Sequence, residues 1–331
     1  MNQNFIDFMR GFYGKKLAVA VSGGVDSVAL LHWLNEIGAD IVCLHVNHGL
    51  RAAADTESEY VSDLCKKLNI PCQIFRWTGK KPDSGVEAAA RSARYKMMTD
   101  FCHDNGIEYL LTAHQADDQI ETFLMNLGRG SGVFGLAAMR AISERDGIQI
   151  VRPLLNVSRD ELKKYCDTRG IKYYTDEMNS DARYTRVKIR QHRHLLRQKL
   201  GISDERILLA IENLNRARDA IANDVDKLVA DVMGDGFAKF SDSFLFDLAH
   251  DIRLKFIGTL IQKIGGDNYQ PRLNSLQLAL NKLHGDTKFT LGHCTIRRLG
   301  TRILVVPEGA KTTFRIRHGK NRQTEKQNQT R

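Results

Sequence analysis

Several features that commonly reveal the class of a protein are missing from this sequence. It contains no Gly-x-x-x-x-Gly-Lys-[Ser/Thr] phosphate loop and no pair of cysteines separated by two residues. No apolar run approaches the roughly 18 residues that would span a membrane. The first residues also lack the charged start and long apolar run of a signal peptide. These absences argue against a Walker-type nucleotide-binding protein and against a membrane-spanning or secreted protein.

The six cysteines are scattered along the chain and stand mostly in apolar surroundings. They are Cys43, Cys65, Cys72, Cys102, Cys166 and Cys294. This usage is typical of buried, reduced thiols, so we expect a cytoplasmic protein.

Positive charge is in excess, with 49 lysines and arginines against 39 acidic residues and a formal net charge of +10. Such an excess favours a polyanionic partner such as nucleic acid, although many proteins of similar charge bind none. With 331 residues, of which 42% are hydrophobic, the chain is expected to form two globular domains.

The most informative stretch lies between Leu17 and Leu31. A valine-rich run predicts a buried parallel strand, and an apolar periodicity after it predicts a helix. The turn between them reads Ser22-Gly23-Gly24-Val25-Asp26-Ser27. Adjacent glycines allow positive φ, and backbone amides of the turn and helix start then converge on one point, which predicts a phosphate site. Asp26 could orient an amide or hold a metal ion there. The alternative interpretation is a simple helix cap after a tight turn.

Strands alternate with helices over the first half of the chain. After the first strand, further strands are predicted at 40–46, 71–77, 108–113 and 149–152. This alternation predicts an α/β fold, a Rossmann-like parallel five-stranded sheet with helices on both faces. Ligands bind at the carboxyl edge of such sheets, where we expect the turn together with His45, Asn47, His48 and His114.

The character of the chain changes near residue 200. We predict a catalytic domain over 1–200, a smaller, mainly helical accessory domain over 201–310 and a basic, disordered tail over 311–331. A helical stretch rich in arginine and lysine precedes the boundary. In the second domain, helices are predicted at 203–233, 248–264 and 273–283, and short strands at 288–291, 294–299 and 302–306.

A second set of candidate residues begins at His114, where the fourth predicted strand ends. Asp118 and Glu121 are three residues apart and share one face of the following helix. Two carboxylates there could bind a cation, hold an amine or act as a base; alternatively they complement the helix dipole. Arg94, on an alanine-rich helix, is either a site residue or a solvated charge. Arg186 is a second candidate for neutralising a developing phosphate charge.

One motif is a decoy. The segment Gly130-Ser131-Gly132-Val133-Phe134-Gly135 matches Gly-x-Gly-x-x-Gly but follows a predicted helix. Dinucleotide binding requires the motif to follow a strand. We therefore interpret it as a loop near a substrate.

The motif from Ser22 to Ser27 resembles the signature of the PP-loop ATP pyrophosphatases, which cleave ATP to AMP and pyrophosphate. Four further segments are similar to one branch of that superfamily, the tRNA(Ile)-lysidine synthetases. They lie at 45–51, 87–95, 114–139 and 176–190, in the order and spacing of that branch. The resemblance covers roughly residues 15 to 190 and is weak beyond 200.

The resemblance implies an ATP-dependent carbon–nitrogen ligase that attaches lysine to C2 of cytidine 34 in the CAU anticodon of tRNA(Ile). An adenylated cytidine would be the intermediate, pyrophosphate and AMP the products, and ATP and Mg²⁺ the cofactors. The tRNA would change from methionine to isoleucine specificity. The resemblance assigns Asp118 and Glu121 to the catalytic acidic pair, Arg94 and Arg186 to the catalytic arginines, and the Ser22–Ser27 turn to ATP. It leaves the metal ligands and a homodimer open, and Val187 stands where the family usually has asparagine.

The nearest alternative is a PP-loop tRNA thiolase, a sulfurtransferase acting on an anticodon-loop base. Such thiolases commonly use paired cysteines, which this chain lacks as C-x-x-C. A non-enzymatic RNA-binding protein with a relic fold would carry a damaged phosphate loop, and here the loop is intact.

Overall fold

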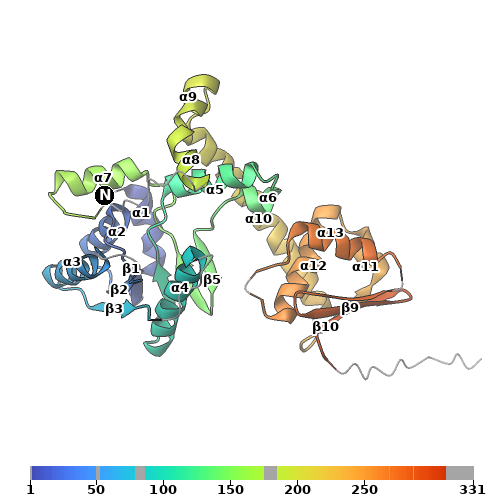
Figure 1. Cartoon of the computed structure of the whole chain (residues 1–331). Coiled ribbons are helices and arrows are strands. Elements are labelled where there is room, and N and C mark those ends of the chain that lie inside the picture. Colours follow the sequence, from blue (N-terminus) through green and yellow to red (C-terminus); the bar gives the residue numbers. More distant parts are fainter. Residues whose placement is uncertain are drawn as a thin grey trace, which may run out of the picture. The chain divides into compact units, whose positions relative to one another are not determined.

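The computed structural model describes residues 2–49, 53–78, 86–174, 185–267, 269–285 and 287–310. The chain forms two compact units, Met1–Ile221 and Ala222–Arg331, which divide inside helix α10 (Asp204–Val232) (Figure 1). The boundary predicted near residue 200 lies just before this helix and stays a prediction. The tail predicted at 311–331, and parts of the motifs at 45–51 and 176–190, lie outside the described residues.

The first unit is built on a six-stranded sheet with the order β3-β2-β1-β4-β6-β5. The strands are β1 (Leu17–Ala20), β2 (Ile41–Asn47), β3 (Cys72–Arg76), β4 (Tyr109–Leu111), β5 (Ile142–Arg145) and β6 (Ile148–Val151). Five of them pair in parallel, as predicted. The sixth, β5, corrects the strand count: it is an edge strand that runs antiparallel to β6.

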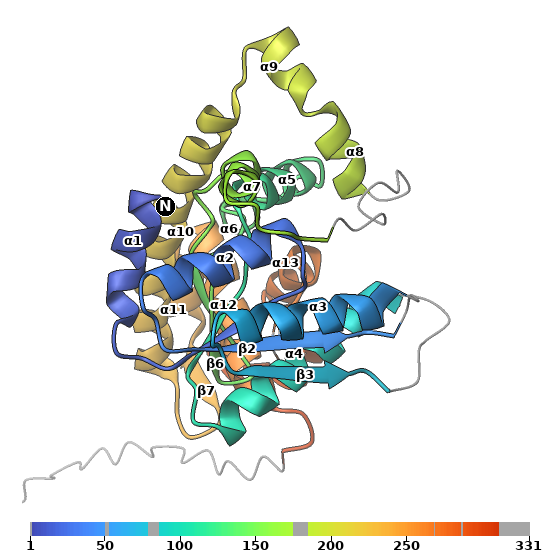
Figure 2. The same cartoon turned by 90° about the vertical axis from the view of Figure 1, so that its left-hand side faces the viewer.

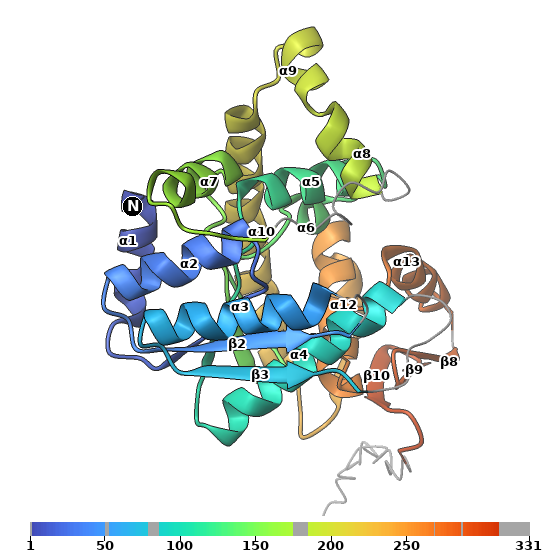
Figure 3. The same cartoon turned by 60° about the vertical axis from the view of Figure 1, so that its left-hand side comes forward.

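Helices cover both faces of this sheet (Figures 2 and 3). Leu17, Val19 and Cys43 point to one face, where they pack in a core with α1 (Gln3–Met9), α2 (Val25–Glu36), α3 (Ala53–Lys67) and α7 (Arg159–Thr168). Ala18 and Leu44 point to the other face and pack with α4 (Val86–Asp104). Burial on both faces accounts for the near-continuous apolar character of the strands.

The unit contains further helical elements besides these. They are the 3₁₀ turn η1 (Arg10–Phe12), α5 (Ala116–Leu127), α6 (Val133–Leu136), α8 (Thr185–His192) and α9 (His194–Leu200). Ile120 of α5 packs with Ile207 and Ile211 of α10. The glycine motif at 130–135 follows helix α5 rather than a strand, which confirms that it is not a dinucleotide fingerprint.

The second unit combines helices with a four-stranded antiparallel sheet of order β7-β10-β9-β8. Its elements are β7 (Ala238–Ser241), α11 (Asp242–Asp247), α12 (His250–Gly265), α13 (Leu273–Lys282), β8 (Lys288–Leu291), β9 (Cys294–Leu299) and β10 (Arg302–Pro307). Phe240 of β7 and Phe256 of α12 meet edge to face, 5.3 Å between ring centres. Strand β7 and the short helix α11 were not predicted. Within the described ranges, none of the helices is both long and apolar enough to cross a membrane.

Candidate active site

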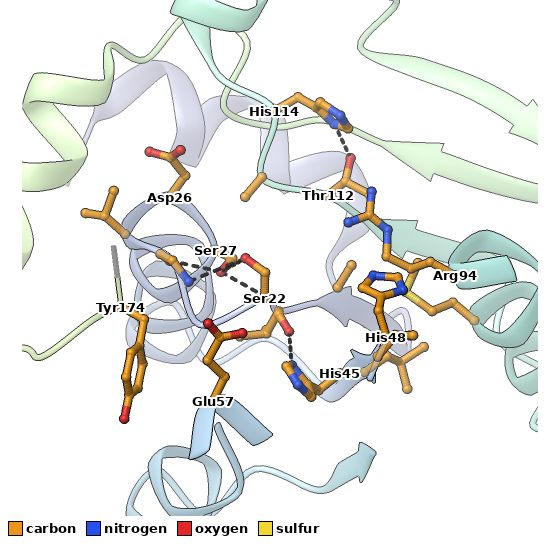
Figure 4. A pocket seen from close by; sticks show the side chains of 18 of the residues that line it. Ser22, Asp26, Ser27, His45, His48, Glu57, Arg94, Thr112, His114 and Tyr174 are labelled. Carbon is orange, nitrogen blue, oxygen red and sulfur yellow. Dashed lines mark hydrogen bonds between the residues drawn. The ribbon is translucent and has the colours of Figure 1, made fainter. Parts of the chain in front are cut away.

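A cavity of about 460 Å³ lies at the carboxyl edge of β1, β2 and β4 (Figure 4). The polar or charged side chains that line it are Ser22, Asp26, Ser27, His45, His48, Glu57, Arg94, Tyr95, Thr112, His114, Arg159 and Tyr174. The sheet edge is where parallel α/β folds bind ligands, so the predicted location of the site agrees with the cavity.

The turn after β1 has the geometry of an anion cradle. Gly23 has a φ of 91°, a conformation that residues with a Cβ rarely adopt. Gly24 is the N-cap of α2 and offers no side chain to cap the first turn, so the helix amides are left for a ligand. The Ser27 hydroxyl donates to the Gly24 carbonyl at 2.9 Å and lies 3.2 Å from the Ser22 hydroxyl. Both serine oxygens are therefore held beside the cradle.

Strand β2 supports this turn from behind. The His45 Nδ1–H donates to the Val21 carbonyl at 2.8 Å, and its Nε2 lies 3.1 Å from Ser58 Oγ on α3. Asn47 Nδ2 donates to Asp55 Oδ1 at 2.8 Å. Of the polar residues expected at the end of β2, His45 and His48 both line the cavity. His45 also connects the residue before the turn to α3, and Asn47 bonds α3.

Arg94 extends from α4 into the cavity, toward Thr112 and His114 (Figure 4). Its Nε is buried without a hydrogen-bond partner, and among the described residues no carboxylate forms an ion pair with it. Burial lowers the pKa of this guanidinium, which means that its charge is held at a cost in free energy. An unpaired cation in such a place favours the binding of an anion.

His114 faces the same space as a neutral imidazole. Burial, followed by the charges of Arg152, Arg91, Arg94 and Arg186, lowers the pKa of His114 to about 3. Its Nδ1 lies 2.9 Å from the Thr112 hydroxyl. His114 can therefore orient a ligand through neutral hydrogen bonds but is a weak base.

Asp26 carries an unsatisfied charge on the opposite side of the cavity. Burial raises its pKa to about 6; Arg159 opposes this shift, while Asp118 and Asp117 add to it. Its Oδ1 is buried and has no hydrogen-bond partner among the residues that the structure describes. A carboxylate oxygen left open beside an anion cradle is a suitable ligand for Mg²⁺, which prefers oxygen donors and phosphates.

The predicted acidic pair does not line this cavity but stands on α5 beside α8. Glu121 has a side chain with 0% exposure; Arg190 donates to its two oxygens at 2.8 and 3.3 Å. Arg186 Nε lies 3.2 Å from the same carboxylate. Asp118 Oδ2 accepts the Gln115 N–H as part of a capping box. The structure thus joins Glu121 to Arg186, and gives Asp118 a capping role that sequence reasoning had considered as the alternative.

The arginine-rich stretch before residue 200 is two helices rather than one. Helix α8 ends at His192 and α9 begins at His194. Arg193, between them, pairs with Asp117 at 3.1 Å and with Asp204 at 3.4 Å. Lys188, Arg197 and Lys199 are exposed. The basic charge is therefore divided between an inner face that holds α5 and an outer face open to solvent.

Several site residues were not found from the sequence. Arg159 follows the N-cap Ser158 after β6, Glu57 lies on α3, and Tyr174 donates its backbone N–H to the Gly23 carbonyl at 2.9 Å. The position of Arg159 after a strand of the same sheet could have identified it. Arg190 could not have been assigned to Glu121, because 69 residues separate them.

Comparison with known proteins identifies relatives over most of the chain. A family model described as a PP-loop domain matches residues 1–198. The tRNA(Ile)-lysidine synthase of Wolbachia sp. subsp. Brugia malayi (strain TRS) is 36% identical over 323 residues, 93% of this chain and 74% of that protein. The tRNA(Ile)-lysidine synthase of Ruegeria pomeroyi is 35% identical over 337 residues, 93% of this chain and 78% of that protein.

A solved structure shares the fold. The U34-tRNA thiolase NcsA from Methanococcus maripaludis, solved with its [4Fe-4S] cluster, has a TM-score of 0.55 and 18% sequence identity. The match covers 65% of this chain and 79% of the thiolase. Among the described residues, no cysteine lines the cavity of the present chain.

Proposed function

Because this chain belongs to the tRNA(Ile)-lysidine synthases of the PP-loop family, we propose that it uses ATP to attach lysine to C2 of the wobble cytidine of tRNA(Ile). The observation that carries the proposal is the Arg94 guanidinium, which no carboxylate of the described residues pairs and which lines the same cavity as the Ser22–Ser27 turn. These groups suit a triphosphate: the cradle takes its outer phosphates and the arginine neutralises charge near the inner one.

In the first step, the C2 oxygen of cytidine attacks the α-phosphorus of ATP and the bond to pyrophosphate breaks. The C2 carbonyl, flanked by two ring nitrogens, is a poor electrophile until its oxygen becomes part of a leaving group. We assign Ser22, Gly23, Gly24, Val25, Asp26 and Ser27 to the departing pyrophosphate. Arg94 neutralises the charge that develops on the α-phosphate, so positioning and electrostatics account for most of the rate.

Asp26 is the residue that would hold Mg²⁺, since its buried Oδ1 has no partner in the described part of the chain. When bound, the ion supplies positive charge to the phosphate oxygens. Asp26 must be ionised for this role. The raised pKa of about 6 therefore places the loss of the binding-competent form just below neutral pH.

In the second step, the lysine ε-amine attacks C2 and expels AMP together with the original C2 oxygen. The amine must lose a proton to act as a nucleophile. We assign this task to Asp118, which is not part of the cavity lining but lies close enough to Asp26 to raise the pKa of that residue; its capping bond uses Oδ2 and leaves Oδ1 for the amine. Glu121 then acts on Arg186 by fixing its guanidinium beside Thr122, whose hydroxyl accepts from Arg186 Nη2 at 3.2 Å.

The net charge of +10 favours binding of a polyanion, and tRNA is the polyanion that this function requires. We assign phosphate contacts to the exposed Lys188, Arg197 and Lys199 and to the second unit. The wobble base must leave its stack to reach the cavity, which costs little in an anticodon loop. We further propose that the enzyme works in the cytoplasm, where its six free thiols stay reduced. Measurement of the molecular mass in solution tests whether it forms a homodimer.

The experiment for this function is mass spectrometry of the wobble nucleoside. The chain is incubated with ATP, isotopically labelled lysine and a tRNA(Ile) transcript bearing CAU, and a transcript with uridine at the wobble position serves as the control. We expect the label in the CAU transcript alone, with pyrophosphate and AMP as products. A sulfur-containing base, or ADP in place of AMP, would contradict the proposal.

Asp26→Asn tests the pH dependence of the site. The wild-type rate should fall as pH drops below about 6. The variant should be slow at every pH and should show no such decrease. The stability effect has the opposite sign. Because the pKa of Asp26 in the folded protein lies above the ordinary aspartate value of 3.8, its ionised form destabilises the fold as pH rises from about 4 to 6. At pH 7 the variant should therefore unfold at a higher temperature than wild type, and this advantage should vanish at pH 4. If wild type and the variant unfold at the same temperature at both pH values, Asp26 is not desolvated in the folded protein.

A further inference from the structure

Three cysteines that are scattered in the sequence meet in the structure. Cys43 lies in β2, Cys65 near the end of α3 and Cys72 at the start of β3. Their sulfur atoms all lie within 4.8 Å of one another. Distance along the sequence therefore gave no sign that these three thiols meet in the fold.

The backbone fixes the positions of these three residues. Cys43 is paired with Cys72 in the register of β2 and β3, and its N–H donates to the Pro71 carbonyl at 2.8 Å. At the end of α3, the Ile70 N–H donates to the Cys65 carbonyl at 2.9 Å. Asn69, with a φ of 56°, makes the tight turn between them. Helix, turn and strand thus bring the thiols together before any ligand binds.

The environment of the cluster is that of a closed site with one entrance. Cys43 and Cys65 have 0% exposure, and Cys72 is partly exposed. None of the three lines the cavity at the phosphate cradle. Packing alone could use cysteines as small apolar residues, but it does not require three sulfur atoms to converge from a helix and two strands.

The spacing suits one soft metal ion. Metal–thiolate bonds of about 2.3 Å place three sulfurs around one ion roughly 4 Å apart. Small rotations of the three side chains bring sulfurs that lie within 4.8 Å to that spacing. Thiolates select soft ions such as Zn²⁺ and Cu⁺ over Mg²⁺ and Ca²⁺. Within the described residues, no histidine or carboxylate joins the group, so the protein supplies three ligands.

We propose that Cys43, Cys65 and Cys72 bind one thiophilic d¹⁰ metal ion, Zn²⁺ or Cu⁺, as a three-thiolate site. Each thiol releases its proton to solvent as the metal–sulfur bond forms. An ion that takes four ligands completes its shell with water on the exposed side of Cys72. The ion ties α3 to β2 and β3. Ser58 of α3 contacts His45, which donates to the Val21 carbonyl at the end of β1. By fixing α3, the ion would therefore also stabilise the segment that enters the phosphate turn.

The test is metal titration of the reduced, metal-free full chain against a chromophoric chelator, with Zn²⁺ and, without oxygen, with Cu⁺. We expect one ion per chain, and the metal that binds with the higher affinity in the two titrations is the ion of this site. Cys72→Ser, at the partly exposed position, should weaken binding at least about 100-fold, beyond the usual cost of disturbing an outer ligand. Cys294→Ser, a buried cysteine of the second unit, is the matched control and should bind as wild type does.

Two further measurements keep the outcome decisive. Circular dichroism must show that Cys72→Ser is folded, and Cys65→Ala replaces it if it is not. The bound ion should also protect Cys72 of the wild type from alkylation. Equal affinity of wild type and the folded variant, or a disulfide within the trio in place of metal uptake, would overturn the proposal. Neither result bears on lysine transfer.

Discussion

Replacement of Arg94 by methionine should slow pyrophosphate release by roughly 10³-fold or more, the range found for arginines that neutralise a transferring phosphoryl group. Methionine keeps much of the side-chain volume and removes the charge. In the wild type the guanidinium is buried, and no carboxylate among the described residues pairs with it, so its loss should not destabilise the fold. Single-turnover assays with saturating tRNA and ATP measure the effect, and tRNA affinity should stay within a few fold.

The matched control for Arg94 is Arg91→Met. Arg91 lies one turn earlier on α4 and is exposed. Both arginines stand near the Tyr95 ring, at 5.2 and 5.7 Å from its centre, but Arg94 is buried against the cavity and Arg91 is not. Arg91→Met should retain near-normal turnover. Comparable loss in both variants would indicate a general effect of helix charge and would remove Arg94 from the α-phosphate.

Replacement of Glu121 by glutamine should both unfold the first unit more readily and abolish lysine transfer. The carboxylate is fully buried and accepts from Arg190, with Arg186 beside it. Removing one partner of a buried ion pair costs about 3 to 5 kcal/mol. We expect a loss of about 3 kcal/mol, because the Arg190 and Arg186 side chains are 29% and 41% exposed. Chemical denaturation measures the stability, and the nucleoside assay measures the transfer.

Double substitution separates the two effects. Adding Arg190→Met to Glu121→Gln removes one of the two uncompensated arginine charges, so it should restore part of the stability but none of the transfer. Asp118→Asn keeps an oxygen for the capping bond, so it should block lysine transfer with normal stability. The exposed pair Glu212–Arg216 is the control, since Glu212→Gln should cost less than about 1 kcal/mol. A stable, active Glu121→Gln enzyme would contradict this account of α5 and α8.

The parts of the fold that follow from local pattern were predictable. The central strands are buried on both faces, so each reads as an apolar run, and Ser22 to Ser27 is a contiguous motif whose turn geometry follows from its glycines. Strand β5 was missed because it is a short edge strand that alternates between exposed and half-buried residues. Strand β7 was missed for lack of length, since four residues carry little periodicity.

The contacts between distant segments were not predictable. Arg94 could be assigned to the cavity or to solvent with equal reason until the packing of α4 was known. The pairing of Glu121 with Arg190, and the meeting of Cys43, Cys65 and Cys72, depend on how helices and strands pack. Residue spacing along one element reports which side chains share its face, but it does not report which segment that face will meet.

The central claim is that the cradle and Arg94 activate cytidine by adenylating its C2 oxygen. A transcript carrying ¹⁸O at C2 of the wobble cytidine tests it directly, with the label followed by mass spectrometry through one turnover. We expect the ¹⁸O in AMP and none in pyrophosphate or inorganic phosphate, because lysine expels the original oxygen on the adenylate. An unlabelled AMP accompanied by formation of the lysine adduct would contradict the account.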